Sequence, residues 1–198
     1  MTSTLPPAFF HRDVLTVARE LLGQTIASHI QDVSVRLQIL ETEAYHESER
    51  GSHTYGGRRT PRTEPMFAQG GISYVYFVYG MHWQFNVVTG VAGTGEAVLI
   101  RAGLPLTEHD AQIVAERRGF GPQKPAPKNL RKWCDGPAKL AQALGIDKQV
   151  NALPLQPGQP VWFESAPPVP ENQVERLPRV GIDYAGEDAL RPWRFLVR

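Results

Sequence analysis

Residues 36–45, RLQILETEAY, alternate between apolar and polar side chains, the pattern of a β-strand. Because successive strand side chains point to opposite faces, the face of Leu37 and Ile39 continues into a polar group. That group is Glu41, Glu43 and Tyr45. A face that begins as core therefore ends in two carboxylates and a phenol. Either the strand runs out into solvent here, or it ends in a polar site.

Hydrophobic spacing and capping residues predict the elements around this strand. A helix begins after the capping residue Asp13 and ends before Gly23. Further helices are predicted over residues 107–118 and 137–144. Strands are predicted over residues 24–30, 33–45, 96–104, 161–164, 179–182 and 193–197. Residues 119–128 are basic and rich in proline, which predicts a loop.

Residues 72–88 predict a β-hairpin whose tip is formed by residues 79–81. Alternation places Tyr74, Tyr76 and Val78 on one face of the first strand, and His82, Gln84 and Asn86 on one face of the second. Tyr79 and Met81 at an exposed tip are unusual for a soluble protein. Such a tip can wedge into a stack of bases. The alternative is that both side chains fold back onto the domain.

These elements predict an α+β fold. We expect residues 1–198 to form a single domain around a curved, mostly antiparallel β-sheet, with peripheral helices and a protruding β-hairpin. No apolar run approaches the ~18 residues that a membrane span needs. Cys134 is the only cysteine, which excludes an intramolecular disulfide and favours a cytoplasmic location. No histidine or cysteine spacing indicates a metal site.

The net charge of +1 is uninformative, but the basic residues cluster. The glycine-rich loop of residues 46–69 carries Arg58, Arg59 and Arg62, and a second cluster spans residues 117–139. Two such clusters suit a phosphate backbone, although ordinary surface charge is the alternative. Arg101 lies on an apolar strand face, where an arginine needs a partner. We expect it to pair with Glu41 and Glu43.

Several motifs occur in one order along nearly the whole chain. They are LETEAY at 40–45, HTYGGRRTPR at 53–62, YVYFVYGMHWQFN at 74–86, AVLIRA at 97–102, CDGPAKLAQAL at 134–144 and RVGIDYAGEDALRPWRF at 179–195. In these motifs the sequence resembles the alkyladenine (3-methyladenine) DNA glycosylases of the human and bacterial type. It departs from them at Thr63, where asparagine is common, and in a longer loop between Asn86 and Arg101.

The resemblance implies a DNA-repair enzyme that flips a damaged purine out of duplex DNA and hydrolyses its N-glycosidic bond, with no metal or cofactor. Glu43 matches the general base that activates the attacking water. Arg101 and the carbonyl of Val180 match groups that hold this water. Because every lysine lies between Lys124 and Lys148, away from these motifs, we expect no lyase activity.

The resemblance also implies how the substrate is held. Tyr45, His53 and Tyr76 match the residues that sandwich the flipped base, and Asn86 matches the residue that crowds a guanine amino group. Tyr79, with Met81 beside it, matches the side chain inserted into the gap in the DNA. Arg58 and Arg62 match contacts to the DNA backbone. 3-Methyladenine, 7-methylguanine, hypoxanthine and ethenoadenine all suit such a pocket. We expect a bacterial, nucleoid-associated monomer that binds double-stranded DNA and no membrane.

Two other functions are compatible with the residues. Glu41 and Glu43 lie two apart on one strand face, so their α-carbons are ~6.5–7 Å apart. This is near the ~6.5–9.5 Å carboxyl separation of inverting carbohydrate hydrolases. The basic clusters and the aromatic hairpin tip do not serve such an enzyme. The second alternative is a nucleic-acid-binding module without catalysis, against which Glu43, Arg101 and the three pocket aromatics all argue.

Overall fold

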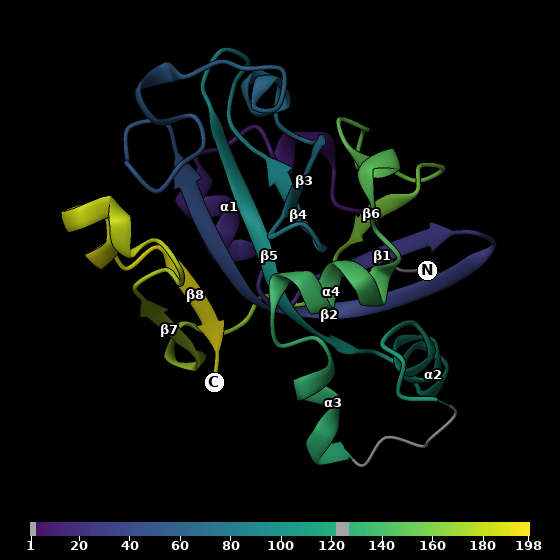
Figure 1. The fold of residues 1–198 in the computed structure, drawn as a ribbon. Helices are drawn as coiled ribbons and strands as arrows, with labels where there is room; N and C mark the ends of the chain where they lie inside the picture. The colour runs from purple at the N-terminus through teal and green to yellow at the C-terminus, as the bar shows by residue number, and fades with distance from the viewer. Residues whose placement is uncertain (1–2, 122–126) are drawn as a thin grey trace.

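A single antiparallel β-sheet organises the computed structural model, which describes residues 3–121 and 127–198. Over these residues the sheet has eight strands in the order β3-β4-β5-β2-β1-β6, with β8 paired to both β2 and β7 (Figure 1). The strands are β1 (Thr25–Ile30), β2 (Val33–His46), β3 (Ser73–Val78), β4 (His82–Val88), β5 (Glu96–Pro105), β6 (Val161–Glu164), β7 (Val174–Leu177) and β8 (Arg194–Val197). The predicted α+β class and antiparallel sheet are confirmed.

Helices cover both faces of this sheet. The α-helices are α1 (Val14–Glu20), α2 (Glu108–Arg117), α3 (Pro127–Trp133) and α4 (Pro137–Leu144). Short 3₁₀ helices are η1 (Pro7–Phe9), η2 (Tyr55–Gly57), η3 (Glu64–Phe67), η4 (Lys148–Val150), η5 (Glu171–Gln173) and η6 (Asp183–Leu190). In Figure 1, α4 crosses the front of the sheet over β4 and β5, and α1 lies behind β2.

Predicted capping residues begin α1 and α2 and bound α4 at both ends, whereas α1 ends at Glu20, before the predicted Gly23. The Asp13 side chain accepts hydrogen bonds from the first amides of α1. Thr107 and Asp110 form a reciprocal capping box at the start of α2. Pro137 opens α4, and Gly145 closes it in the left-handed conformation, with φ of 74°. Local sequence therefore determines where along the chain these three helices begin.

Strand β2 is the longest strand and links the two halves of the sheet. Its first half pairs with β1, its second half pairs with β8, and β5 pairs along its other edge. The β2–β5 register shifts on both sides of Glu41. The register is the same on either side of this irregularity, with Ile39 opposite Gly103 and Thr42 opposite Ile100, and Glu41 and Glu43 both contact Arg101, in agreement with the predicted alternation.

The hairpin of β3 and β4 projects as predicted. Tyr79 and Gly80 both have positive φ, 54° and 67°, which closes the turn tightly. The side chains of Tyr79 and Met81 are 81% and 68% exposed. The alternative, in which both fold back onto the domain, is wrong.

Two predicted segments differ from the structure. Residues 179–182 are not a strand, because Arg179 is buried in an ion pair and Gly181 has a φ of 78°. The partner of β8 is instead β7. Helix α3 was not predicted, because Pro127 suggested a loop. Proline is tolerated in the first turn of a helix, and Pro127 stands there. Residues 119–121 of the predicted loop are not helical, and its residues 122–126 lie outside the described residues.

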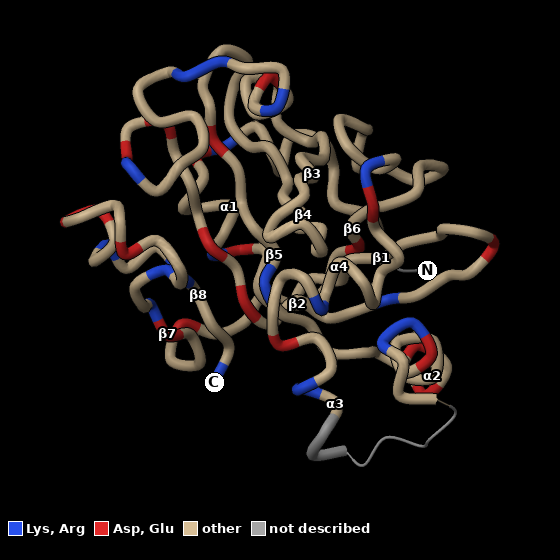
Figure 2. The backbone as a smooth tube through the Cα atoms, in the orientation of Figure 1, with Lys and Arg blue, Asp and Glu red and all other residues tan. Residues whose placement is uncertain are grey.

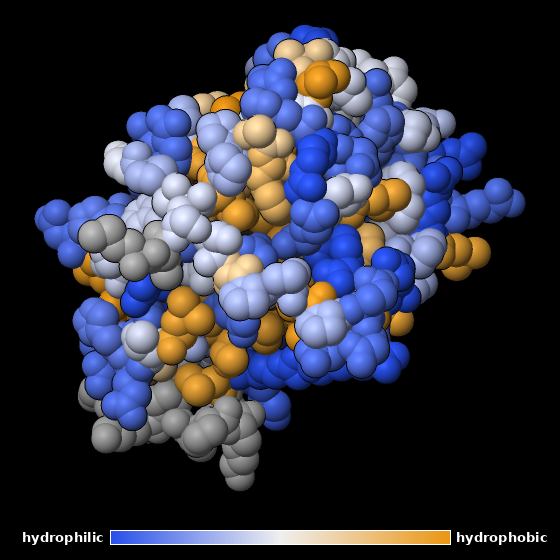
Figure 3. Space-filling model, turned by 180° about the vertical axis from the view of Figure 1, so that it is seen from behind, coloured by the Kyte–Doolittle hydropathy of each residue, from blue (hydrophilic) through white to orange (hydrophobic). Residues whose placement is uncertain are grey.

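Apolar side chains from α1, α4 and the sheet form the main core, and a smaller cluster surrounds Met66 and Tyr74. Seen from behind, the surface is mainly hydrophilic, with hydrophobic residues in separate patches (Figure 3). None of the helices in residues 3–121 and 127–198 is long and apolar enough to span a membrane.

Candidate active site

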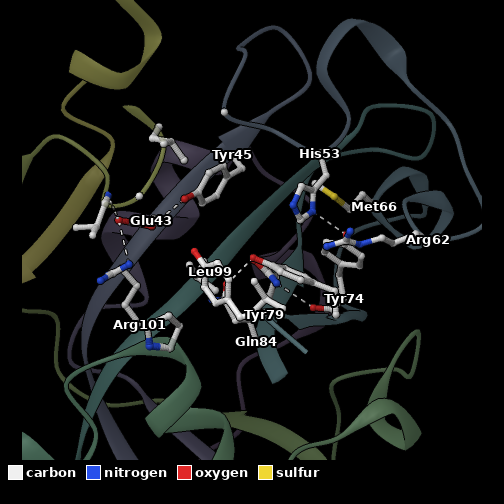
Figure 4. Close-up of a pocket in the computed structure, with 18 of the residues that line it drawn as sticks. Glu43, Tyr45, His53, Arg62, Met66, Tyr74, Tyr79, Gln84, Leu99 and Arg101 are labelled. Atoms are coloured by element: carbon white, nitrogen blue, oxygen red, sulfur yellow. Dashed lines mark hydrogen bonds and ion pairs between the residues drawn. The ribbon is translucent and has the colours of Figure 1, made fainter. Parts of the chain in front are cut away.

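The floor of one pocket is a row of side chains across four adjacent strands (Figure 4). Pairing aligns Tyr74 of β3 with Asn86 of β4, Asn86 with Leu99 of β5, and Leu99 with Glu43 of β2. All four residues line the pocket. Thr42, which precedes Glu43, points to the opposite face and donates to the carbonyl of Ala18 in α1. The pocket therefore opens on the face of the sheet that carries α4.

Glu43 is fully buried and its carboxylate has three partners. Oε1 accepts a hydrogen bond from the Val180 amide at 2.8 Å, and Oε2 accepts one from the Tyr45 hydroxyl at 2.9 Å. Nη1 of Arg101 lies 3.4 Å from Oε1. These contacts hold both oxygens in fixed positions at the pocket wall. The first alternative, a strand end exposed to solvent, is wrong.

Arg101 pairs with both predicted carboxylates. Its Nε donates to Oε1 of Glu41 at 3.0 Å, while Nη1 faces Glu43. A second arginine, Arg194 of β8, donates to the same Glu41 oxygen at 2.9 Å. Glu41 therefore acts as an anchor between two guanidinium groups, and it is Glu43 that faces the pocket.

The environment changes the acidity of the site. Burial raises the pKa of Glu43 above its ordinary value, although the Arg101 charge, the Val180 amide and the Tyr45 hydroxyl act in the lowering direction. Burial and the Glu43 charge raise the pKa of Tyr45 well above that of a free phenol. Tyr45 is therefore a hydrogen-bond donor at neutral pH. A carboxylate with a raised pKa is a stronger base than an ordinary glutamate.

His53, from the loop after β2, forms another wall. Its Nδ1 lies 2.9 Å from the Tyr74 hydroxyl, and its ring centre is 4.7 Å from that of Tyr76, edge to face. Burial, assisted by the charge of Arg62, lowers the pKa of His53 to about 4. The imidazole is therefore neutral at neutral pH. It presents an uncharged, polarisable surface to the pocket.

Asn86 and Gln84 project from β4 into the pocket. The Asn86 side chain is buried and donates to the carbonyl of Tyr74 at 3.0 Å. This bond fixes Asn86 independently of the longer loop that follows β4. Gln84 accepts a hydrogen bond from the Tyr76 hydroxyl and so orients that ring.

The basic loop lies at the pocket rim. Arg62 lines the pocket, and its guanidinium lies 5.0 Å from the centre of the Tyr76 ring. Arg58 is exposed and lines an adjoining basic hollow instead. Thr63, the departure from the resembling family, accepts a hydrogen bond from the Thr60 amide at 2.8 Å and donates to the Arg58 carbonyl at 3.1 Å. Its hydroxyl therefore supplies the contact that closes this loop.

One pocket brings together most of the predicted site residues. Those that line it are Glu43, Arg101, Val180, Tyr45, His53, Tyr76, Asn86, Tyr79 and Arg62. Met81 and Arg58 do not line it. The amide of Val180 contacts Glu43, whereas the water contact predicted for its carbonyl stays a prediction.

Sequence reasoning missed other residues of the site. Gln84 lies on the predicted pocket face of its strand, so the alternation of strand side chains alone could have identified it. Tyr184 of η6 also lines the pocket but follows a segment that was predicted as a strand. Arg179 and Glu49 form a buried ion pair behind the pocket, with no periodic signal in the sequence.

Comparison with known proteins shows the family of this chain. A sequence model of the family described as "Methylpurine-DNA glycosylase (MPG)" matches residues 8–198. A protein of Clostridium beijerinckii is 41% identical over 190 residues, which is 96% of this chain and 93% of that protein. A protein of Desulfitobacterium hafniense is 43% identical over 194 residues, covering 94% of this chain and 91% of its own length. Both carry the name "Putative 3-methyladenine DNA glycosylase".

The family model and these relatives identify the chain as a DNA glycosylase, an enzyme of DNA repair. The chain belongs to the methylpurine-DNA glycosylase family. Its substrate is therefore DNA.

Proposed function

We propose that the pocket receives a damaged purine flipped out of duplex DNA, and that Glu43 activates the water that hydrolyses its N-glycosidic bond. The burial of Glu43, with both carboxylate oxygens held at the pocket wall, is the observation that carries this proposal. The proposal agrees with the family to which the chain belongs.

The chemistry needs one activated water. The water oxygen bonds to C1′ of the deoxyribose, its proton passes to Glu43, and the C1′–N bond electrons leave with the base. A positioned general base of this kind contributes typically ~10²–10⁴-fold to a rate. The Arg101 guanidinium stabilises the ionised form of Glu43 before attack. In this proposal, Arg101 and the Val180 carbonyl also hold the water.

Aromatic side chains supply the binding energy for the flipped base. Tyr45, His53 and Tyr76 line the same pocket, and each stacking contact with a base contributes roughly 1–3 kcal/mol. Because His53 is neutral, it does not repel a cationic alkylated purine. We propose 3-methyladenine, 7-methylguanine, hypoxanthine and ethenoadenine as the candidate lesions, with Asn86 crowding a guanine amino group.

The DNA itself is held by the hairpin tip and the basic loop. Tyr79 lines the pocket and is also 81% exposed, so it can enter the gap left by the flipped nucleotide. Met81 lies beside it, and Arg58 and Arg62 contact the backbone phosphates. The protein works as a monomer in this proposal, because one chain supplies every residue of the pocket.

The Glu41/Glu43 pair of a carbohydrate hydrolase receives little support. Glu41 is held by Arg101 and Arg194 and does not line the pocket. An acid–base pair needs both carboxyl groups to reach the substrate.

We also propose base removal without strand cleavage by an amine. Helix α4 brings Lys139 closer to the site than its sequence position suggested, since Pro137 of the same helix lines the pocket. The Lys139 amine is held in an ion pair with Asp135 at 2.6 Å and does not line the pocket. A lyase needs a free amine that reaches C1′ to form a Schiff base.

The test is single-turnover excision from two labelled duplexes, one with hypoxanthine and one with 3-methyladenine, read with and without alkali. Glu43→Gln removes the carboxylate that acts as the general base but keeps the shape of the side chain. We expect wild type to release a base, with strand breaks only after alkali, and Glu43→Gln to lose at least ~10²-fold in rate. Duplex binding by Glu43→Gln should match wild type.

Glu164→Gln serves as a control, because Glu164 is a buried glutamate at the opposite end of the strand order from the pocket. It should excise at the wild-type rate. Excision by Glu43→Gln at that same rate would refute the assignment of the base. Binding without base release by wild type would favour the non-catalytic module.

A further inference from the structure

Behind the pocket lies an ion pair whose two side chains are both fully buried, formed by Arg179 and Glu49. Nη1 of Arg179 lies 2.6 Å from Oε1 of Glu49, and Nη2 lies 2.7 Å from Oε2. This two-pronged geometry is specific to arginine. The two residues are 130 positions apart in the chain, so the pair joins segments that are distant in sequence.

The same guanidinium holds three segments around the pocket. Nη1 also donates to the carbonyl of Ala44 at the end of β2, at 2.8 Å. Nη2 donates to the carbonyl of Asp188 in η6, at 3.1 Å. Glu49 in turn accepts a hydrogen bond at 2.7 Å from the amide of Gly51, which lines the pocket. Arg179 and Glu49 therefore tie β2, the loop before His53 and η6 together.

Two of the three partners of Glu43 lie next to Arg179. The amide that donates to Oε1 belongs to Val180, the next residue in the chain. The ring of Tyr45, whose hydroxyl donates to Oε2, lies 4.7 Å from the Arg179 guanidinium. Only Arg101 reaches Glu43 from an independent element, β5.

We propose that Arg179, held by Glu49, is a positioning residue that keeps the Val180 amide and the Tyr45 hydroxyl in place on the catalytic carboxylate. This inference rests on the proposed role of Glu43. A displacement of about 1 Å at a reacting group costs on the order of 10²-fold in rate. The ion pair thus contributes to catalysis without touching the substrate.

The experiment separates positioning from folding by removing the pair in two ways. Arg179→Met alone leaves the Glu49 carboxylate buried and unpaired, which is strongly destabilising. The double variant Arg179→Met/Glu49→Leu replaces both charges with apolar groups of similar size, a change that is often neutral for stability. We expect the double variant to melt at a higher temperature than Arg179→Met.

The proposal predicts that stability and catalysis then diverge. The double variant should still excise hypoxanthine about 10²-fold more slowly than wild type at a single turnover, with little change in duplex affinity. The rising limb of its pH–rate profile should move to higher pH, because the ionised Glu43 has lost donors while Arg101, Glu41 and Tyr76 still surround it.

A double variant with the wild-type rate and pH profile would overturn the proposal. Arg179→Lys keeps the charge but loses the two-pronged geometry, and it tests the same point if the double variant fails to fold. It should also be slow, and a wild-type rate for it would equally overturn the proposal.

The matched control is Arg19→Lys, since Arg19 also binds a glutamate and a backbone carbonyl but lies outside the pocket. It should excise normally. If Glu43→Gln keeps wild-type activity, the proposed function fails. If Glu43→Gln is inactive and the Arg179 variants keep the wild-type rate and pH–rate profile, the proposed function stands and the positioning role fails.

Discussion

The hydroxyl of Tyr45 has two roles at the scale of single residues, because its ring lines the pocket and its proton is donated to Glu43. Tyr45→Phe keeps the ring and removes the donor. A hydrogen bond to an ionised carboxylate favours the ionised form, so its loss raises the pKa of Glu43 still further. We expect the rising limb of the pH–rate profile to lie above the ordinary glutamate range in wild type and higher again in Tyr45→Phe.

Single-turnover excision between pH 5 and about 9 measures this limb. Tyr55→Phe is the control, since Tyr55 is exposed and lines the adjoining basic hollow rather than the pocket. If the rising limb lies at the same pH in wild type and in Tyr45→Phe, the Tyr45 hydroxyl does not govern the ionisation of Glu43.

The alternation of side chains along the strands predicted the central residues of the site but not the residues that support them. The pairing of Arg101 with Glu41 and Glu43 followed from an arginine on an apolar face, and the structure confirms it. The ion pair of Arg179 and Glu49 had no such signal, because its partners lie 130 residues apart in irregular segments. Periodicity describes what shares a face of one element, and it does not identify which loops meet in space.

At the scale of elements, the exposed tip of the β3–β4 hairpin predicts the effect of removing the Tyr79 side chain. Tyr79→Ala should leave the free energy of unfolding within ~0.5 kcal/mol of wild type, because the side chain is 81% exposed. Excision from duplex DNA should fall about 10- to 100-fold, since stacking of the Tyr79 ring in the gap, which contributes roughly 1–3 kcal/mol, is lost. Excision from a single strand should change much less, because no base stack has to be held open.

Val91→Ala is the control for this hairpin, as Val91 is 60% exposed but lies in the loop after β4. Equal losses on duplex and single-stranded DNA in Tyr79→Ala would indicate a pocket defect rather than the loss of a wedge.

The start of β5 gives a prediction about stability. Glu96 accepts a hydrogen bond from the Val14 amide in α1, and burial raises its pKa from 4.5 to about 7. Its folded-state pKa is therefore above the unfolded value. The stability that it contributes is fully present below pH 4.5 and is lost as the pH rises through about 7. Glu96→Gln cannot ionise, so it should not show this loss.

Urea unfolding at pH 5 and at pH 8 tests this expectation. Relative to wild type, Glu96→Gln should gain on the order of 1–2 kcal/mol between the two pH values, since one pKa unit corresponds to about 1.4 kcal/mol and solvent screens part of the effect. The same substitution at an exposed glutamate, Glu108→Gln, is the matched control. A constant difference between wild type and Glu96→Gln at both pH values would argue against a raised pKa.

Elements with local signals were predicted closely, and those defined by distant partners were not. The segment predicted as residues 161–164 agrees with β6, and α4 agrees at both ends because Pro137 and Gly145 mark them. Strand β7 was missed because only its pairing with β8 makes it a strand. That the whole chain is one domain stays a prediction.

At the scale of the whole molecule, charge is nearly balanced but unevenly placed. Figure 2 shows the arginines of the loop between β2 and β3 at the opposite end of the molecule from α2 and α3. The net charge is +1, so attraction to DNA has to come from local clusters rather than from the total. The pocket opens beside this loop, because Arg62 lines it.

The salt dependence of DNA binding follows from this placement. Arg58, Arg59 and Arg62 are all exposed in one loop, and of the three only Arg59 forms an ion pair, with Glu64 at 2.9 Å. Among the described residues, Arg58 and Arg62 form no ion pair and are available to phosphates. Each phosphate contact adds about 0.9 to the slope of log affinity against log salt.

Arg58→Ala and Arg62→Ala should therefore each reduce the slope by about 1 and weaken binding alike for lesion and undamaged duplexes. Titrations of Glu43→Gln background protein with a labelled duplex, over a range of salt concentrations, measure the slope without base release. Arg59→Ala, a neighbour whose charge is already neutralised, should leave the slope unchanged. A slope that falls equally in all three variants would mean that the loop acts through its total charge rather than through two phosphate contacts.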